Sequence, residues 1–130
     1  MKREPRWLSL KTVLAIHKDQ IDQFGGSFDV RDMGLLESAL MRPQNLRHYD
    51  PKSTILSLAA SYGFGLAKNH PFIDGNKRVA FMSMYVFLGL NGFEINASES
   101  EAVEIMLAVA DGSASEDRLS EWLTENVQKS

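Results

Sequence analysis

The segment from Asn76 to Leu90 most constrains the fold, because apolar side chains cover most faces of its helical pattern. Only Ser83 and Gly89 interrupt the apolar run that begins at Val79. A helix that is apolar nearly all round is buried among other elements, and this run is too short to cross a bilayer. The sequence therefore predicts a central helix enclosed by a bundle.

Helical spacing of apolar residues continues along nearly the whole chain, with capping residues and glycines at the boundaries. Strand-like alternation is confined to residues 92–97, so the predicted class is all-α. The segment 44–52 has a proline at each margin and no clear period, which predicts a loop or a small hairpin flap before the central helices. The other predicted helices in the first half of the chain are Leu8–Phe24, which Gly25-Gly26 ends, and Asp32–Leu40, which Arg42-Pro43 ends. Ser53 is expected to cap a helix over Ile55–Asn69. Ser98 and Glu101 form a capping box for Ser98–Ala110, and Ser115 opens a last helix.

The chain has 130 residues and no repeat or linker, so we expect a single domain over residues 1–130. The formal net charge is −3, which does not favour direct binding of nucleic acid. The absence of cysteine excludes disulfides and thiolate metal sites. Met1-Lys2-Arg3 is followed by Glu4-Pro5-Arg6 rather than by an apolar run. We therefore expect a soluble, cytoplasmic protein with neither a secretory signal nor a membrane partner.

Residues 70–78, His-Pro-Phe-Ile-Asp-Gly-Asn-Lys-Arg, form a corner between two helical patterns. The first N–H groups of a helix lack intrahelical partners, and the helix dipole favours negative charge at that end. Lys77 and Arg78 stand in the first turn, where a cation opposes the dipole unless an anion is present. This combination favours a phosphate group as the ligand.

His70 is the candidate general base of the corner. A neutral imidazole can accept the proton of a hydroxyl nucleophile near physiological pH. Pro71 predicts an extended backbone at His70. The other histidines, His17 within a helical pattern and His48 in the polar segment, are interpreted as structural.

Asp74 has two candidate roles. It can cap the following helix, which stabilises by about 1 kcal/mol, or it can ligate Mg²⁺, which is held by few carboxylates together with substrate phosphates. Gly75 permits dihedrals that gather N–H groups into an anion nest, and Asn76 can cap the helix or bond a phosphate oxygen. Zinc is disfavoured, because no third ligand lies near the pair formed by His70 and Asp74.

The corner resembles the Fic motif of the Fic/Doc family, H-P-F-x-[DE]-G-N-[GK]-R, and matches it throughout residues 70–78. Further segments are similar to the death-on-curing toxins of that family. They are Ile16-His17, Phe24-Gly25-Gly26, residues 31–39, Arg42-Pro43 and residues 87–92. The resemblance covers most of the chain and implies a compact helical Fic fold.

The resemblance implies that a phosphate-containing group moves from a nucleotide to a protein hydroxyl. It also implies a flap over residues 42–52 that clamps the target segment. The site that it implies consists of His70 as the base, Asp74 as the ligand of Mg²⁺ on the phosphates of ATP, Gly75 and Asn76 lining an anion hole, and Lys77 and Arg78 as catalytic phosphate-binding residues. Such catalysis is mostly positioning and electrostatic stabilisation.

Two residues distinguish the chain from Fic AMP-transferases, which usually have glycine at the position of Lys77 and a second arginine at that of Phe81. A lysine side chain fills space that nucleotide phosphates occupy, and loss of the arginine removes a phosphate clamp. Doc-like toxins share both traits and look like kinases that transfer the γ-phosphate of ATP to a threonine of elongation factor Tu, which arrests translation. Doc has alanine at the position of Gly75, so AMP transfer to a protein hydroxyl stays the alternative.

Many Fic proteins carry an inhibitory helix with the pattern [ST]-x-x-x-E-[GN], which this sequence lacks. The spacing from Ser120 to Glu125-Asn126 is one residue too long, and Ser100 to Glu104 is followed by Ile105. Inhibition by a separate antitoxin, whose helix binds in a groove, is therefore the better hypothesis. The leading hypothesis is a Doc-like Ser/Thr kinase toxin of a type II toxin–antitoxin system.

A third hypothesis is a helical domain that binds nucleotide or peptide and has lost turnover. The intact pair of His70 and Asp74 argues against it, since loss of turnover is expected to erode that pair first.

Overall fold

The computed structural model describes residues 4–130 and is built almost entirely of helices, which confirms the all-α class. Met1-Lys2-Arg3, the basic start considered as a possible secretory signal, lies outside the described residues. Within residues 4–130, none of the helices combines the length and the apolar character needed to cross a bilayer. The elements in chain order are α1 (Leu10–Phe24), α2 (Met33–Tyr49), α3 (Ile55–Asn69), α4 (Asn76–Leu90), β1 (Phe93–Ile95), α5 (Glu99–Asp111), α6 (Glu116–Asn126) and β2 (Val127–Lys129).

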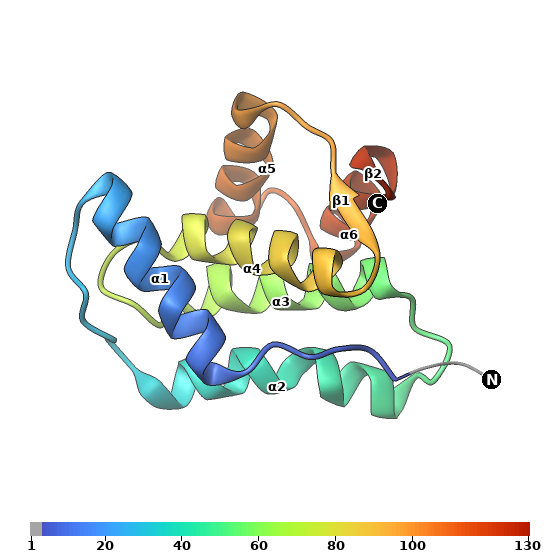
Figure 1. Cartoon of the computed structure of the whole chain (residues 1–130), viewed down its shortest axis with the longest axis horizontal. Coiled ribbons are helices and arrows are strands. Elements are labelled where there is room, and N and C mark those ends of the chain that lie inside the picture. Colours follow the sequence, from blue (N-terminus) through green and yellow to red (C-terminus); the bar gives the residue numbers. More distant parts are fainter. Residues whose placement is uncertain (1–3) are drawn as a thin grey trace.

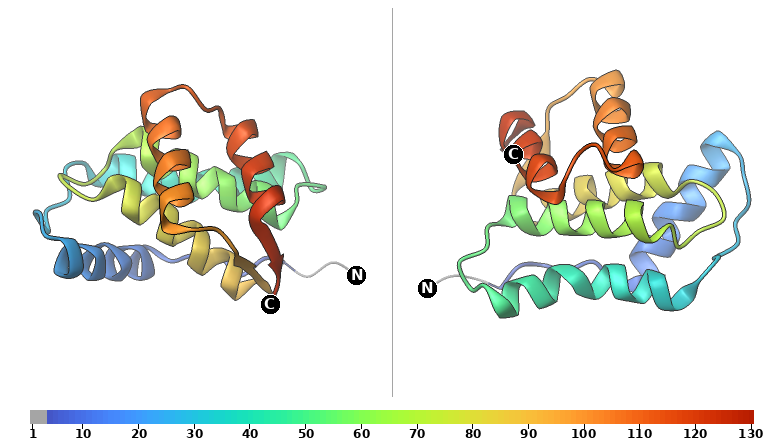
Figure 2. Two further views of the ribbon diagram at one scale, coloured as in Figure 1. Left: turned by 90° about the horizontal axis from the view of Figure 1, so that it is seen from above. Right: turned by 180° about the vertical axis from the view of Figure 1, so that it is seen from behind.

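The helices α3 and α4 form a central pair, with α2 on one side and with α5 and α6 on the other (Figure 1). The first helix, α1, packs across α4. The views from above and behind place α5 and α6 next to each other over the central pair (Figure 2). The strands β1 and β2 pair antiparallel near the C-terminus, with Ile95 opposite Val127, so the alternation of residues 92–97 does mark a strand.

The helix α4 lies in the central pair, as its apolar run predicted, and its partner α3 is the more enclosed of the two. A Cβ atom on Gly63 would lie 2.4 Å from the sulfur of Met84, so its absence lets α3 and α4 approach closely. Side chains of α4 reach solvent at Tyr85 and Leu90, which are 44% and 43% exposed. The small residues of α3 let neighbouring helices pack against it on several sides. The larger side chains of α4 also cover the side of α4 that faces solvent.

A buried tyrosine ties the N-terminal segment to α3. The hydroxyl oxygen of Tyr62 accepts a hydrogen bond from the backbone N–H of Leu8 at 3.0 Å. Burial raises the pKa of Tyr62 above its ordinary value of 10.0, and the bond from Leu8 opposes that shift only in part. Tyr62 therefore stays protonated in the folded protein at pH values where an exposed tyrosine begins to ionise.

The helix α2 does not end at Arg42-Pro43, and no hairpin flap forms over residues 44–52, so both predictions are wrong. The helix continues through Pro43 to Tyr49. A proline inside a helix removes one hydrogen bond and strains the preceding turn. Here Pro43 is buried and Leu46 packs against the core, which offsets that cost. Only residues 50–54 connect α2 to α3.

Helix starts follow the local capping chemistry of the sequence. The helix starts predicted at Ser98 and Ser115 are confirmed as N-caps, and Asp32, predicted as the first residue of a helix, is the N-cap of α2; each accepts a hydrogen bond from an N–H of the first turn. The cap of α3 is Thr54 rather than Ser53, since a reciprocal capping box is available only from Thr54.

Candidate functional site

Residues of the 70–78 corner surround one cavity where α3 ends and α4 begins. The cavity has a volume of about 190 Å³. This is below the roughly 300–1,000 Å³ of pockets that enclose a whole small molecule, so it suits phosphate groups rather than an entire nucleotide. Its lining residues are His70, Ile73, Asp74, Gly75, Asn76, Lys77 and Arg78, which include every site residue that the sequence singled out.

His70 ends α3 in the left-handed region, with φ 50° and ψ 54°, so the extended backbone predicted from Pro71 is wrong. It is the one non-glycine residue with positive φ in residues 4–130. Its N–H bonds the carbonyl of Leu66, and this helix-ending geometry overrides the local preference that proline imposes. Such a backbone costs about 1–3 kcal/mol and persists only where surrounding contacts enforce it.

Asn76 closes the loop with its side-chain amide. Its Oδ1 accepts from the N–H of Phe72 and its Nδ2 donates to the carbonyl of Phe72, each at 2.9 Å. Both residues are buried. Ile73, by contrast, is 46% exposed, so Phe72 rather than Ile73 anchors this turn in the core. With its side chain engaged in the loop, Asn76 has its backbone N–H, at the start of α4, to offer an anion.

Asp74 does not cap α4. Gly75 occupies the N-cap position, with φ 84°, so no side chain caps this helix. Its carboxylate turns instead toward the segment after α1, where Oδ2 accepts from the N–H of Ser27 at 2.8 Å. A Cβ on Gly26 would lie 2.9 Å from the Cβ of Asp74, so the two segments touch.

The buried imidazole of His17 supports the same loop from α1. Its Nε2 donates to the carbonyl of Asp74 at 2.9 Å, and its ring stacks on Phe72 with centroids 3.8 Å apart. The sequence correctly indicated a structural role for His17, but it did not reveal that this role concerns the candidate site. Its place in the Ile16-His17 segment, which resembles the toxins, was the available hint.

The two cations of the corner differ in their surroundings. Lys77 is exposed at the cavity wall. The guanidinium of Arg78 lies over the ring of Phe24, 5.0 Å from its centroid, and Nη2 approaches the carbonyl of Gly25 at 3.5 Å. The Nε of Arg78 is buried and has no hydrogen-bond partner among residues 4–130. The cavity therefore carries two positive side chains against the single carboxylate of Asp74.

Phe81, at the position where AMP-transferases have a second arginine, is absent from the cavity lining. Its ring meets Trp122 of α6 edge-on, with centroids 6.4 Å apart. This position is thus part of the apolar packing between α4 and α6.

A magnesium ion would have one carboxylate available at the cavity. Oδ1 of Asp74 accepts no hydrogen bond from residues 4–130, so it is free to bind a cation. No group of three potential metal-binding side chains occurs in the described part of the chain. Asp74 therefore fits a Mg²⁺ ion that takes its remaining ligands from phosphates and water, and it does not form a metal site alone.

The fold and this site define a class: helical proteins in which a histidine-led, cation-bearing loop enters a central helix. The chain belongs to the Fic/DOC family, whose sequence model matches residues 7–88. It is 41% identical over 75 residues to "Toxin Doc" of Mycolicibacterium smegmatis, a match that covers 57% of this chain and 58% of that protein. It is 29% identical over 118 residues to "Protein kinase doc" of Escherichia phage P1, covering 91% of this chain and 93% of that protein.

Proposed function

We propose that this chain, acting as one Fic/Doc domain over residues 1–130, is a Doc-type toxin kinase. It transfers the γ-phosphate of ATP to a Ser or Thr hydroxyl of a translation factor, elongation factor Tu being the leading candidate. Modification of that factor arrests translation, and such a target places the reaction in the cytoplasm. The names of the two relatives support this proposal at the level of the family.

The observation that carries the proposal is the shared cavity of a histidine, two cations and a helix N-terminus. His70, Lys77 and Arg78 line one small space, and the backbone start of α4 closes it. Phosphoryl transfer depends mainly on positioning and on stabilising charge at the phosphate oxygens. The arrangement supplies both, beside a residue that can accept a proton.

In the proposed step, His70 accepts the proton of the target hydroxyl as its oxygen attacks the γ-phosphorus. A new O–P bond forms, the bond from the γ-phosphorus to the β–γ bridging oxygen breaks, and ADP leaves with the electron pair. Lys77 and Arg78, with the first N–H groups of α4, stabilise the negative charge on the phosphates. Bound by Asp74 and the nucleotide, Mg²⁺ would supply further charge neutralisation.

One residue favours the AMP-transferase alternative. Gly75 has φ 84°, a conformation that alanine rarely adopts, so this loop retains the glycine of the Fic motif. The packing of Phe81 on Trp122 argues in the other direction, since no second arginine reaches the phosphates from that position. The balance favours transfer of the γ-phosphate.

The test incubates the protein and purified elongation factor Tu with ATP labelled on either the α- or the γ-phosphate. Label from γ on the factor, lost with His70→Ala, is the expected result. Label from α would replace the kinase with AMP transfer. No transfer from either position, to this factor or to proteins of a cell extract, would leave only the silent binding domain.

We further propose that a separate antitoxin silences the enzyme by placing a helix in a groove beside the cavity. The toxin name of one relative supports an antitoxin partner. Co-expression of a short protein encoded next to this gene should relieve growth arrest and abolish γ-label transfer. Growth arrest that such a neighbour does not relieve would count against this partner.

A further inference from the structure

The left-handed backbone of His70 is held from outside residues 70–78, because its N–H bonds Leu66 and its carbonyl accepts from Arg31. A residue before proline disfavours helical dihedrals, and a left-handed conformation is rare for a side chain with a Cβ. The last carbonyls of α3 also lack intrahelical partners. Hydrogen bonds to the carbonyls around His70 would satisfy these groups and restrain the backbone together.

Arg31, from the segment between α1 and α2, bonds those carbonyls. Its Nε donates to the carbonyl of His70 at 2.7 Å, and its Nη2 donates to the carbonyl of Asn69 at 2.9 Å. The planar guanidinium makes both bonds at once, which fixes the relative orientation of the two peptide groups. No ion pair joins Arg31 to a carboxylate in the described part of the chain, so the carbonyls at the negative end of α3 are its partners.

The backbone around Arg31 holds the next residues of the loop. The N–H groups of Arg31 and Asp32 both bond the carbonyl of Pro71, at 2.8 and 3.0 Å. Val30 pairs with Phe72 in an isolated antiparallel bridge. The backbone of residues 30–32 thus bonds Pro71 and Phe72, which follow His70. The side chain of Arg31 bonds the carbonyls of Asn69 and His70.

We propose that Arg31 is a positioning residue for His70: its two hydrogen bonds hold the left-handed backbone that directs the imidazole to the cavity. The catalytic role of His70 in this statement rests on the proposed function. The alternative role is that Arg31 only stabilises the end of α3. The two roles differ in what happens to His70 when the protein stays folded without Arg31.

The first test reads the position of His70 without any substrate. The chain has three histidines, His17, His48 and His70, so their ring carbon–proton signals are readily assigned by NMR. Arg31→Ala should shift or broaden the ring signal of His70 and leave that of His48 unchanged. A His70 signal identical to that of the wild type would overturn the proposal, whatever reaction the protein catalyses.

The chain offers a matched control at the other end of α3. Arg47 donates from Nη1 to the carbonyl of Ser53 at 2.7 Å, so it too is an arginine that bonds a backbone carbonyl. Arg47→Ala should leave the His70 signal in place. If it moved His70 as much as Arg31→Ala does, the effect would be general loosening of α3, and the proposal would fail.

The second test uses transfer of the γ-phosphate. Arg31→Ala should lower kcat about 100-fold, the typical effect of misplacing a catalytic group by about 1 Å, while KM for ATP stays within about twofold. Guanidinium chloride far below denaturing concentrations should restore part of the rate to Arg31→Ala and none to His70→Ala. If guanidinium restored no rate to Arg31→Ala, or if Arg31→Ala had an unchanged kcat, the proposal that the two hydrogen bonds of Arg31 position His70 would be contradicted.

Arg31→Lys keeps the test decisive if the alanine variant unfolds. Lysine retains the charge but cannot bond both carbonyls in one plane. It should fold, show an altered His70 signal and have an intermediate kcat. Full wild-type kcat and an unchanged His70 signal in this variant would show that the paired hydrogen bonds of the Arg31 guanidinium are dispensable. If the wild type transfers no phosphate at all, the proposed function fails while the NMR comparison still decides the role of Arg31.

Discussion

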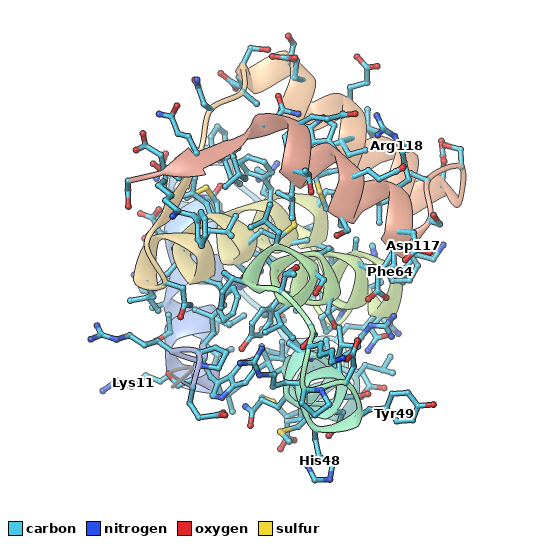
Figure 3. The ribbon with its side chains drawn as sticks, turned by 90° about the vertical axis from the view of Figure 1, so that its right-hand side faces the viewer. Lys11, His48, Tyr49, Phe64, Asp117 and Arg118 are labelled. Carbon is cyan, nitrogen blue, oxygen red and sulfur yellow. The ribbon has the colours of Figure 1, made fainter. Side chains whose placement is uncertain are left out.

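The two connections at the ends of α3 are held in opposite ways. Residues 50–54, which lead into α3, are held by bonds to near neighbours: Ser53 to Asp50 and Arg47 to Ser53, six residues apart at most. Residues 70–75, which lead out of α3, are held largely by segments 39 to 57 residues away. The side chains of His48 and Tyr49 point away from the helices beside the first connection (Figure 3).

The difference shows where the molecule is preorganised. A turn held by local bonds can rearrange without disturbing distant elements, and Tyr49 there is 89% exposed. The loop after α3 cannot shift unless contacts from α1 and from the segment before α2 break together. Catalysis by positioning requires the second kind of loop, since the geometry must exist before the reaction.

The largest expected contrast between the two ends uses one histidine at each. His70→Ala should abolish γ-phosphate transfer, because it removes the proposed base, and the carboxylate of Asp74, which also lines the cavity, would be engaged by Mg²⁺. His48→Ala, beside the locally held connection, should transfer at nearly the wild-type rate. Equal activity of the two variants, measured with labelled ATP, would remove His70 from the role of base.

Breaking a remote support should affect both stability and transfer. His17→Ala loses the stack on Phe72 and the bond to the carbonyl of Asp74, which should cost about 2–4 kcal/mol in the free energy of unfolding. Transfer should fall about tenfold or more, because Asp74 and His70 share the loop. Lys18→Ala, at an exposed neighbouring position, is the control and should change neither quantity; denaturant unfolding and label transfer measure both.

The adjacent glycines Gly25 and Gly26 test whether contact with Asp74 helps to hold the loop after α3. A Cβ on Gly26 would lie 2.9 Å from the Cβ of Asp74, whereas a Cβ on Gly25 would have no atom of residues 4–130 within 4 Å, apart from its chain neighbours. Both have positive φ, so both alanine variants carry backbone strain. Gly26→Ala should be less stable than Gly25→Ala by about 1–2 kcal/mol and should transfer less phosphate. Equal losses in chemical unfolding and transfer would mean that contact with Asp74 is unimportant.

The smallest expected effect is a pH dependence from Tyr62, in the middle of α3. Burial raises its pKa, so the unfolded chain releases the phenolic proton at lower pH than the folded protein does. Stability is therefore fully present below pH 10.0 and falls as the pH rises through the folded pKa. Tyr62→Phe should lose about 1 kcal/mol at neutral pH, since the N–H of Leu8 loses its acceptor, but should lack this alkaline decline.

Unfolding curves at pH 8 and at pH values above 10.0 would measure this effect. If the wild type and Tyr62→Phe declined in parallel above pH 10.0, another group would be responsible.

The same division between local and remote contacts explains what the sequence could predict. The caps at Asp32, Ser98 and Ser115 depend on residues within one turn, so they were predictable. The passage of α2 through Pro43 was not, because burial of that proline outweighs its local cost to the helix. The backbone of His70 was mispredicted in the same way, because contacts with other segments outweigh the preference of a residue before proline.

The candidate site was predictable in its residues but not in its supports. The lining of the cavity follows the contiguous 70–78 corner, and that corner is visible in the sequence. His17, Ser27 and Arg31 reach it only through the fold, and each lies 38 or more residues from its partner. For the same reason the sequence could not decide between the two candidate roles of Asp74, of which the helix cap is not realised because the carboxylate bonds Ser27 instead.

The central claim, that the loop after α3 is built before any nucleotide binds, is tested most directly by amide hydrogen exchange in the free protein. The N–H groups of Phe72 and Ile73, bonded to Asn76 and Asp29, should exchange at least about 100-fold more slowly than those of Lys52 and Ser53. Exchange at Phe72 and Ile73 as fast as at Lys52 and Ser53, with protection appearing only when ATP is added, would contradict the account.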